Sequence, residues 1–177
     1  MSEKGLIHVY YGDGKGKTTA SLGLALRAAG CEKNVVIVEF IKNWICGEHN
    51  SIPHISNITL LRGKAAGGKF IREMSDEEKQ VTKASQDECL RKALELVESG
   101  QCDVLILDEA IEAQSLGMLD AELIEGLIHN KPDSLELVIT GHDPDTRLLE
   151  KADYVTEMVK RKHPYDEGVC ARQGIEF

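Results

Sequence analysis

The sequence predicts a three-layer α/β fold in which helices cover both faces of a mostly parallel β-sheet. Two observations indicate this fold class. Short segments rich in β-branched and aliphatic residues alternate along the chain with longer segments of helical periodicity. The apolar segments are also continuous, which is typical of strands buried on both faces of a parallel sheet. Because 177 residues suffice for one hydrophobic core but not for two, residues 1–177 are expected to form a single domain.

The strands of this sheet are expected at six apolar segments. Four of them have a clear pattern, at residues 6–10, 35–40, 104–107 and 137–140. Two further segments, residues 58–61 and 154–158, have a weaker pattern of the same kind.

Helical segments separate these strands. Residues 17–29 carry apolar side chains at helical spacing, and Gly30 provides the stop. Ser75 and Glu78 form a capping box that opens a long helix toward residue 100, whose mostly polar first half is expected to face solvent. Two shorter helices are expected at residues 120–129 and 143–152, the second with Asp143 as N-cap and Pro144 as its first residue.

Two stretches, residues 42–57 and 63–74, are expected to be irregular. Long loops are uncommon in compact domains and are often binding loops, although a plain surface loop is the alternative for each.

The composition excludes several classes of protein. With a net charge of −9, the chain lacks the basic balance of a general nucleic-acid binder, so no nucleic-acid partner is expected. No secretory signal and no apolar run of about 18 residues are present, so no membrane partner is expected either. The five cysteines contain no C-x-x-C pair, which favours reduced thiols in a cytoplasmic protein and argues against a structural zinc site.

A glycine-rich segment lies between the first predicted strand and the first predicted helix. It consists of Gly12, Asp13, Gly14, Lys15, Gly16, Lys17, Thr18 and Thr19. Glycines let backbone amides point at an anion, and a helix N-terminus adds unpaired donors and a positive dipole end. This context predicts a phosphate-binding loop for ATP. Tyr11 occupies the first glycine position of the common motif, so the loop is either one residue short or begins on a tyrosine.

A pair of carboxylates, Asp108 and Glu109, follows the predicted strand at residues 104–107. Ligands of open parallel sheets bind at the carboxyl ends of the strands, so this pair is expected near Thr18. Thr18, Asp108 and Glu109 are therefore the candidate ligands for Mg²⁺ or Mn²⁺, directly or through waters. Loop and carboxylates together predict a P-loop NTPase-like (RecA-like) fold and a single P-loop nucleotide-binding domain.

The fold does not specify the reaction, and an ATPase or a small-molecule kinase is compatible with these motifs. The motifs as a set, in their order along nearly the whole chain, resemble the P-loop family of ATP:corrinoid adenosyltransferases. They are Tyr10–Ala20 around the shortened loop, Val38–Lys42, Leu107–Glu109, Ile139–Gly141, and the closing pair Lys162–Gly168 and Gly174–Phe177.

The resemblance implies that the 5′-deoxyadenosyl group of ATP moves to the cobalt(I) of a reduced corrinoid while triphosphate leaves. Lys17 and Glu109 are then the expected catalytic residues, Lys17 because it stabilises the leaving group and Glu109 because it holds the metal. The resemblance further implies a reduced flavin-protein electron donor and a homodimer.

In the family, apolar or aromatic groups displace the lower axial ligand of the corrinoid. A Gly-Phe-x-Trp-like stretch of the family corresponds here to Gly68-Lys-Phe-Ile71, so Phe70 matches the phenylalanine and the tryptophan is missing. Phe70 and Trp44, which lies on the other long loop, are the candidate corrinoid residues. The missing tryptophan keeps a second alternative open, a paralogue that binds ATP or a corrinoid without catalysis.

Overall fold

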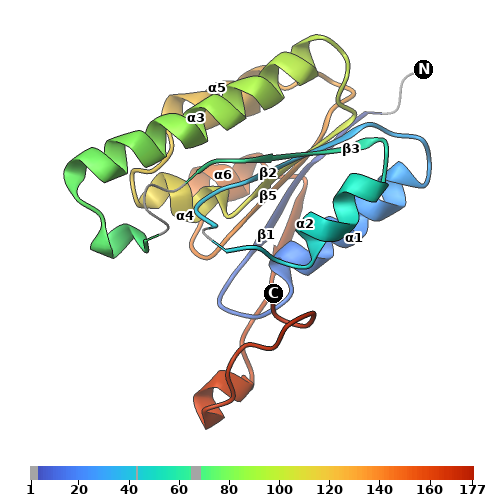
Figure 1. The fold of residues 1–177 in the computed structure, drawn as a ribbon. Helices are drawn as coiled ribbons and strands as arrows, with labels where there is room; N and C mark the ends of the chain where they lie inside the picture. The colour runs from blue at the N-terminus through green and yellow to red at the C-terminus, as the bar shows by residue number, and fades with distance from the viewer. Residues whose placement is uncertain (1–3, 43, 65–68) are drawn as a thin grey trace.

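The computed structural model describes residues 4–42, 44–64 and 69–177, and its centre is a six-stranded sheet in the order β3-β2-β4-β5-β1-β6 (Figure 1). All five neighbouring pairs of strands are parallel. The strands are β1 (Ile7–Tyr11), β2 (Val35–Glu39), β3 (Ile58–Arg62), β4 (Val104–Asp108), β5 (Glu136–Gly141) and β6 (Tyr154–Glu157). The predicted parallel sheet is therefore confirmed, including its two segments of weaker pattern.

Helices cover both faces of the sheet, as the sequence predicts. Figure 1 shows one layer formed by α1 (Lys17–Ala29) and α2 (Glu48–Ser51). The opposite layer contains α3 (Asp76–Glu98), α4 (Ala110–Ser115), α5 (Ala121–Asn130) and α6 (Thr146–Lys151). Short 3-10 helices lie at η1 (Ile52–His54), η3 (Ile71–Glu73) and η4 (Pro164–Glu167).

The sheet separates two hydrophobic clusters. Successive residues of a strand point to opposite faces, so Val36 and Leu105 pack under α3 and α5, whereas Ile37 and Ile106 pack under α1. All five residues of β2 and of β4 are buried. Burial on both faces explains why these strands are continuous apolar runs.

The first half of α3 differs from the prediction that it faces solvent, because Thr82, Gln86 and Asp87 are buried there. Their polar groups hold neighbouring loops. Oε1 of Gln86 accepts from the amide of Ile41, and Oδ1 of Asp87 accepts from the amide of Asp120. The helical period alone does not distinguish a polar residue that faces solvent from one that binds a buried loop.

Other local predictions were also wrong. Helix α6 begins at Thr146 with Asp145 as its N-cap, whose Oδ1 accepts from the amide of Arg147, so the predicted start, with Asp143 as N-cap and Pro144 as first residue, is two residues early. The stretch 42–57 contains α2 and η1 instead of being wholly irregular, and η3 lies within residues 63–74. Helix α4, of six residues, was not predicted.

The last part of the chain, residues 158–177, extends away from the sheet after β6 as an arm, and its end returns toward the start of α1 (Figure 1). All four residues of β6 are exposed. Within the described residues, no helix is long and apolar enough to cross a membrane.

Candidate nucleotide-binding site

The glycine-rich loop joins the carboxyl end of β1 to the start of α1. Gly16 precedes the helix with a φ of 117°, a conformation that side chains with a Cβ rarely adopt. No side chain caps α1, so the amides of its first turn have no partner within the helix. These amides and the positive end of the helix dipole form an anion site.

The arm braces this loop. The amide of Gly14 donates to the carbonyl of Met158 at 2.6 Å, and a Cβ at Gly14 would lie 2.5 Å from that same oxygen. The amide of Gly12 donates to the carbonyl of His142 at 3.0 Å. The amides of Gly12 and Gly14 thus bond to protein carbonyls in this structure.

The two loop side chains with predicted roles, Lys17 and Thr18, have hydrogen-bond partners beside the cavity. Nζ of Lys17 donates to the carbonyls of Gly12, at 2.7 Å, and Gly14, at 3.1 Å, which holds its ammonium over the loop. Oγ1 of Thr18 donates to Oδ2 of Asp108 at 3.2 Å, so the structure brings together the predicted loop threonine and the predicted carboxylate.

Both carboxylate oxygens of Asp108 have protein partners. Oδ1 accepts from Oγ1 of Thr140 at 2.9 Å, and Oδ2 accepts from Nζ of Lys42 at 2.7 Å as well as from Thr18. Asp108 is 1% exposed. It therefore orients Thr18 and does not face the cavity, unlike its neighbour Glu109.

Lys42 is a buried cation that is not among the predicted site residues. Its ammonium lies 3.6 Å from Oε1 of Glu39 and 3.7 Å from Oε1 of Glu48, in addition to the bond to Asp108. Burial by itself lowers the pKa of Lys42. The nearby carboxylates of Asp108 and Glu39 together raise this pKa by more than burial lowers it, so the net shift is upward. In the sequence, Lys42 could have been identified as a site residue because it follows closely after a buried strand that ends in Glu39.

Glu109 lies at the start of α4 with a φ of 59°, and its amide donates to Oγ1 of Thr140 at 2.9 Å. Burial, together with the nearby charge of Asp108, raises the pKa of Glu109 to about 7. A carboxylate in such a place is stabilised by a bound cation.

The loop and the carboxylate of Glu109 line a cavity of about 690 Å³. Every predicted ATP-binding residue except Gly12 lines it, as do Glu109 and Thr140. Glu112 also lines the cavity and was missed by the sequence analysis. Both of its carboxylate oxygens are buried without a hydrogen-bond partner among the described residues, and Nε2 of His142 lies 3.6 Å from Oε1.

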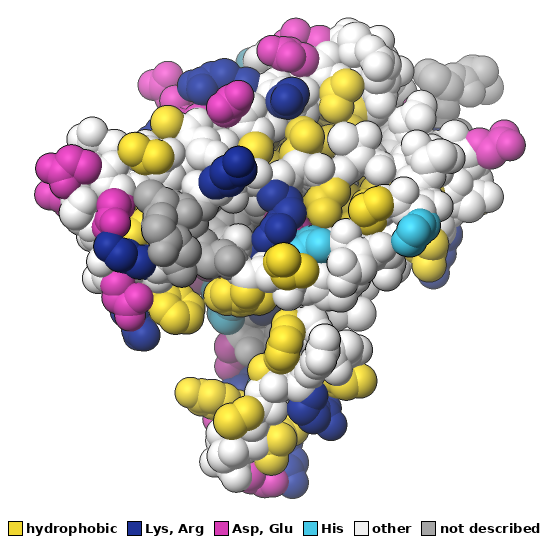
Figure 2. Space-filling model, viewed as in Figure 1, with side chains coloured by type: hydrophobic (Ala, Val, Ile, Leu, Met, Phe, Trp, Pro, Cys, Tyr) yellow, Lys and Arg dark blue, Asp and Glu magenta, His cyan; other side chains and the backbone are white. Residues whose placement is uncertain are grey.

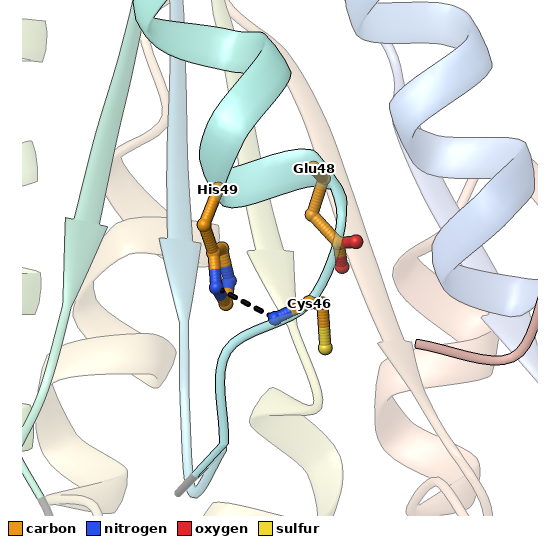
Figure 3. Close-up of side chains that lie close together, drawn as sticks. All are labelled: Cys46, Glu48 and His49. Atoms are coloured by element: carbon orange, nitrogen blue, oxygen red, sulfur yellow. Dashed lines mark hydrogen bonds between the residues drawn. The ribbon is translucent and has the colours of Figure 1, made fainter. Parts of the chain in front are cut away.

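One wall of the cavity carries Cys46 and Glu48, which with His49 bring ligand atoms within 4.8 Å of one another (Figure 3). A search for C-x-x-C pairs cannot find a group of this kind, because its three side chains are a thiol, a carboxylate and an imidazole. Nδ1 of His49 accepts from the amide of Cys46 at 2.9 Å, and its Nε2 bonds to Oε2 of Glu39 at 2.7 Å. Because both ring nitrogens have partners, we interpret His49 as the residue that fixes this loop. All five cysteines are free.

A second, mostly apolar cavity of about 580 Å³ adjoins the first. Its lining includes Phe70 and Trp44, whose ring centroids are 6.2 Å apart although they come from different loops. Trp44 and Glu109 line both cavities. Ile41 also lines the second cavity with a φ of 49°, so both it and Glu109 have strained backbones of the kind that gathers at functional sites. Gly68 lies outside the described residues.

The parallel sheet, the loop before α1 and the carboxylates after β4 place the chain in the class of α/β proteins with a P-loop-like fold. The sequence profile of the family described as ATP:corrinoid adenosyltransferase BtuR/CobO/CobP matches residues 3–177. The chain therefore belongs to the ATP:corrinoid adenosyltransferase family.

Individual relatives agree with this assignment. The chain is 35% identical to a corrinoid adenosyltransferase of Sinorhizobium sp, over 99% of this chain and 81% of that protein. It is 34% identical to a corrinoid adenosyltransferase of Escherichia coli K12, over 100% of this chain and 88% of that protein. It is 33% identical to the corrinoid adenosyltransferase CobA of Salmonella typhimurium, again over 100% and 88%.

Proposed function

We propose that this chain transfers the 5′-deoxyadenosyl group of ATP to the cobalt(I) of a reduced corrinoid in cobalamin biosynthesis. The observation that supports this most directly is the pair of adjoining cavities. One has a phosphate-binding loop, the other is mostly apolar, and Trp44 and Glu109 line both. Two substrates that must exchange a carbon group at close range fit such a pair.

The chemistry requires a good leaving group and no protein nucleophile. The electron pair of cobalt(I) forms the bond to C5′ of ATP, while the bond between C5′ and oxygen breaks and its electrons leave with the triphosphate. Charge then develops at the α-phosphate end. Lys17 and the amides at the start of α1 stabilise that charge, which is the role that preorganised donors have in other transfer reactions.

The oxygen ligands present fit a magnesium ion. A hydroxyl from Thr18 and a carboxylate from Glu109 are hard donors on the cavity wall. Burial, and after it the charge of Asp108, raises the pKa of Glu109, so a cation bound beside this carboxyl would favour its charged form. We propose that Thr18 and Glu109 hold the ion and that Asp108 positions Thr18. When bound, the ion neutralises triphosphate charge.

Phe70 and Trp44 are the proposed apolar groups on the corrinoid side. Their rings lie together at the second cavity, which supports Trp44 as the partner aromatic for Phe70 in a chain that lacks the family's tryptophan. From the resemblance, we also expect a reduced flavin protein as electron donor, a homodimer and a cytoplasmic location.

A product assay tests the proposal. With ATP, Mg²⁺ and chemically reduced cobalamin, we expect inorganic triphosphate in a 1:1 ratio to the light-sensitive Co–C absorbance. ADP and phosphate without Co–C absorbance would instead identify an ATPase or a kinase. Binding of both ligands with no turnover under strong reduction would identify a non-catalytic paralogue.

A further inference from the structure

We propose that the segment Gly174–Phe177 forms the nucleoside side of the ATP cavity, with Phe177 and Ile175 as the apolar contact of the adenine base. This inference rests on the proposed function in one respect, that ATP is the ligand of the cavity. It adds a base-binding subsite from the end of the arm, about 160 residues away in sequence from the loop.

The first step is the position of this segment. Ile175, Glu176 and Phe177 line the same cavity as the phosphate-binding loop. Nζ of Lys15 donates to the carbonyl of Ile175 at 3.4 Å. The end of the arm thus lies against the loop that is expected to hold the triphosphate, within reach of the remainder of the same ligand.

The second step is the chemistry of the walls. Lys15, Lys17 and the start of α1 form a cationic end that suits phosphates, while Glu112 on another wall has a carboxylate without a hydrogen-bond partner among the described residues and repels them. The apolar contacts on the loop side come from Leu22, Ile175 and Phe177. A nucleobase has flat faces that stack on aromatic and aliphatic groups, so this wall suits the base.

The third step is that the segment has a defined shape. Nε and Nη2 of Arg172 both donate to the carboxylate of Glu176, and the amide of Gly174 donates to the carbonyl of Phe177 at 2.7 Å. Gly174 has a φ of 75°, which allows this tight turn. The turn presents Ile175, 57% exposed, and Phe177, 38% exposed.

Hydrophobic side chains gather along the arm at the bottom of Figure 2. Among those that are exposed, Tyr165 and Val169 do not line the cavity, whereas Ile175 and Phe177 do. The arm therefore supplies its own matched control, an exposed aromatic residue at Tyr165 that is outside the proposed contact.

The test must separate contact with the base from bracing of the loop, because the arm also bonds to the loop. The carbonyl of Met158 accepts from the amide of Gly14, and the amide of Lys160 donates to Oδ1 of Asp13. We would measure the Kd of Mg-ATP and of inorganic triphosphate for wild type, Phe177→Ala, Phe177→Tyr and Tyr165→Ala. Inorganic triphosphate has the phosphates of ATP without the nucleoside, so a base contact affects ATP alone.

We expect Phe177→Ala to weaken ATP on the order of tenfold, the scale of one lost base–aromatic stack, and to leave triphosphate within about twofold. Phe177→Tyr should restore ATP binding, and Tyr165→Ala should bind both ligands as wild type does. Unchanged ATP affinity in Phe177→Ala, or an equal loss for both ligands, would overturn the base contact. A wild-type chain that binds neither ligand would instead refute the proposed function itself.

Discussion

Nζ of Lys42 lies 2.7 Å from Oδ2 of Asp108, and the side chains are 7% and 1% exposed. This pair joins the end of β4 to the residues that follow β2, and Glu39 at the end of β2 lies in register with Asp108. Lys42 thus compensates the buried carboxylate of Asp108 and shares that of Glu39 with Arg62, whose Nε lies 3.2 Å from Oε2 of Glu39. Through Asp108 it also influences where Thr18 points.

Removal of this cation should destabilise the fold. Lys42→Met leaves Asp108 and Glu39 buried with less compensation, and loss of one partner of a buried ion pair costs about 3–5 kcal/mol. Denaturant unfolding measures the change in the free energy of unfolding. The control is Lys162→Met, which breaks the exposed pair with Glu167 and should have no measurable effect. Equal stability of the two variants would show that the buried pair is not needed for stability.

Lys17 should be required for transfer. Lys17→Ala removes the ammonium proposed to stabilise the departing triphosphate, so the rate from cobalt(I) should fall by about 100-fold or more and ATP should bind more weakly. Single-turnover transfer and equilibrium ATP binding measure the two effects. Lys33→Ala, at an exposed site remote from the cavity, should behave as wild type. A fully active Lys17→Ala variant would remove the loop from the mechanism.

The aromatic pair should matter mainly for reduction. Phe70→Ala and Trp44→Ala each remove an apolar group from the second cavity, so the reaction that starts from cobalt(II) should slow on the order of tenfold, with a smaller effect from cobalt(I). Val81→Ala, exposed on α3 and outside both cavities, is the control. Equal slowing from both cobalt states would exclude the reductive role of these rings.

Glu109 should set the metal requirement. With Glu109→Gln the carboxylate is replaced by an amide of the same shape, so the Mg²⁺ concentration that gives half-maximal transfer should rise about tenfold or more, the scale of a lost ligand interaction. A magnesium titration at saturating ATP measures it. Glu122→Gln, on α5 away from the cavity, should leave the titration unchanged. An unchanged midpoint in Glu109→Gln would assign the metal to other ligands.

Gly141 should tolerate no side chain. A Cβ there would lie 2.3 Å from Cβ of Ile111 and 2.5 Å from Oε2 of Glu112, so Gly141→Ala should cost about 1–3 kcal/mol of stability and weaken ATP binding because Glu112 must move. Gly126→Ala, a helical position where nothing lies within 4 Å, should be neutral or stabilising. Thermal unfolding distinguishes them, and a neutral Gly141→Ala would show that this wall relaxes easily.

Much of the fold was predictable because its signals are local. The strands are buried on both faces, so their apolar runs are visible without knowledge of their neighbours, and the capping box at Ser75 marks the start of α3. Local patterns failed where a polar residue serves a distant loop. Gln86 is polar and buried because it bonds to Ile41, and no sequence period shows that.

The sequence by itself determined the parallel α/β sheet, the phosphate-binding loop and the carboxylate pair after β4, because each depends on residues adjacent in the chain. The tertiary structure alone decided how they are used. It placed Asp108 against Lys42 and Thr18, left Glu109 facing the cavity, and brought Trp44 beside Phe70. These pairings depend on which strand ends and loops meet in space. The strand order determines which of them meet, and no single segment of the sequence specifies that order.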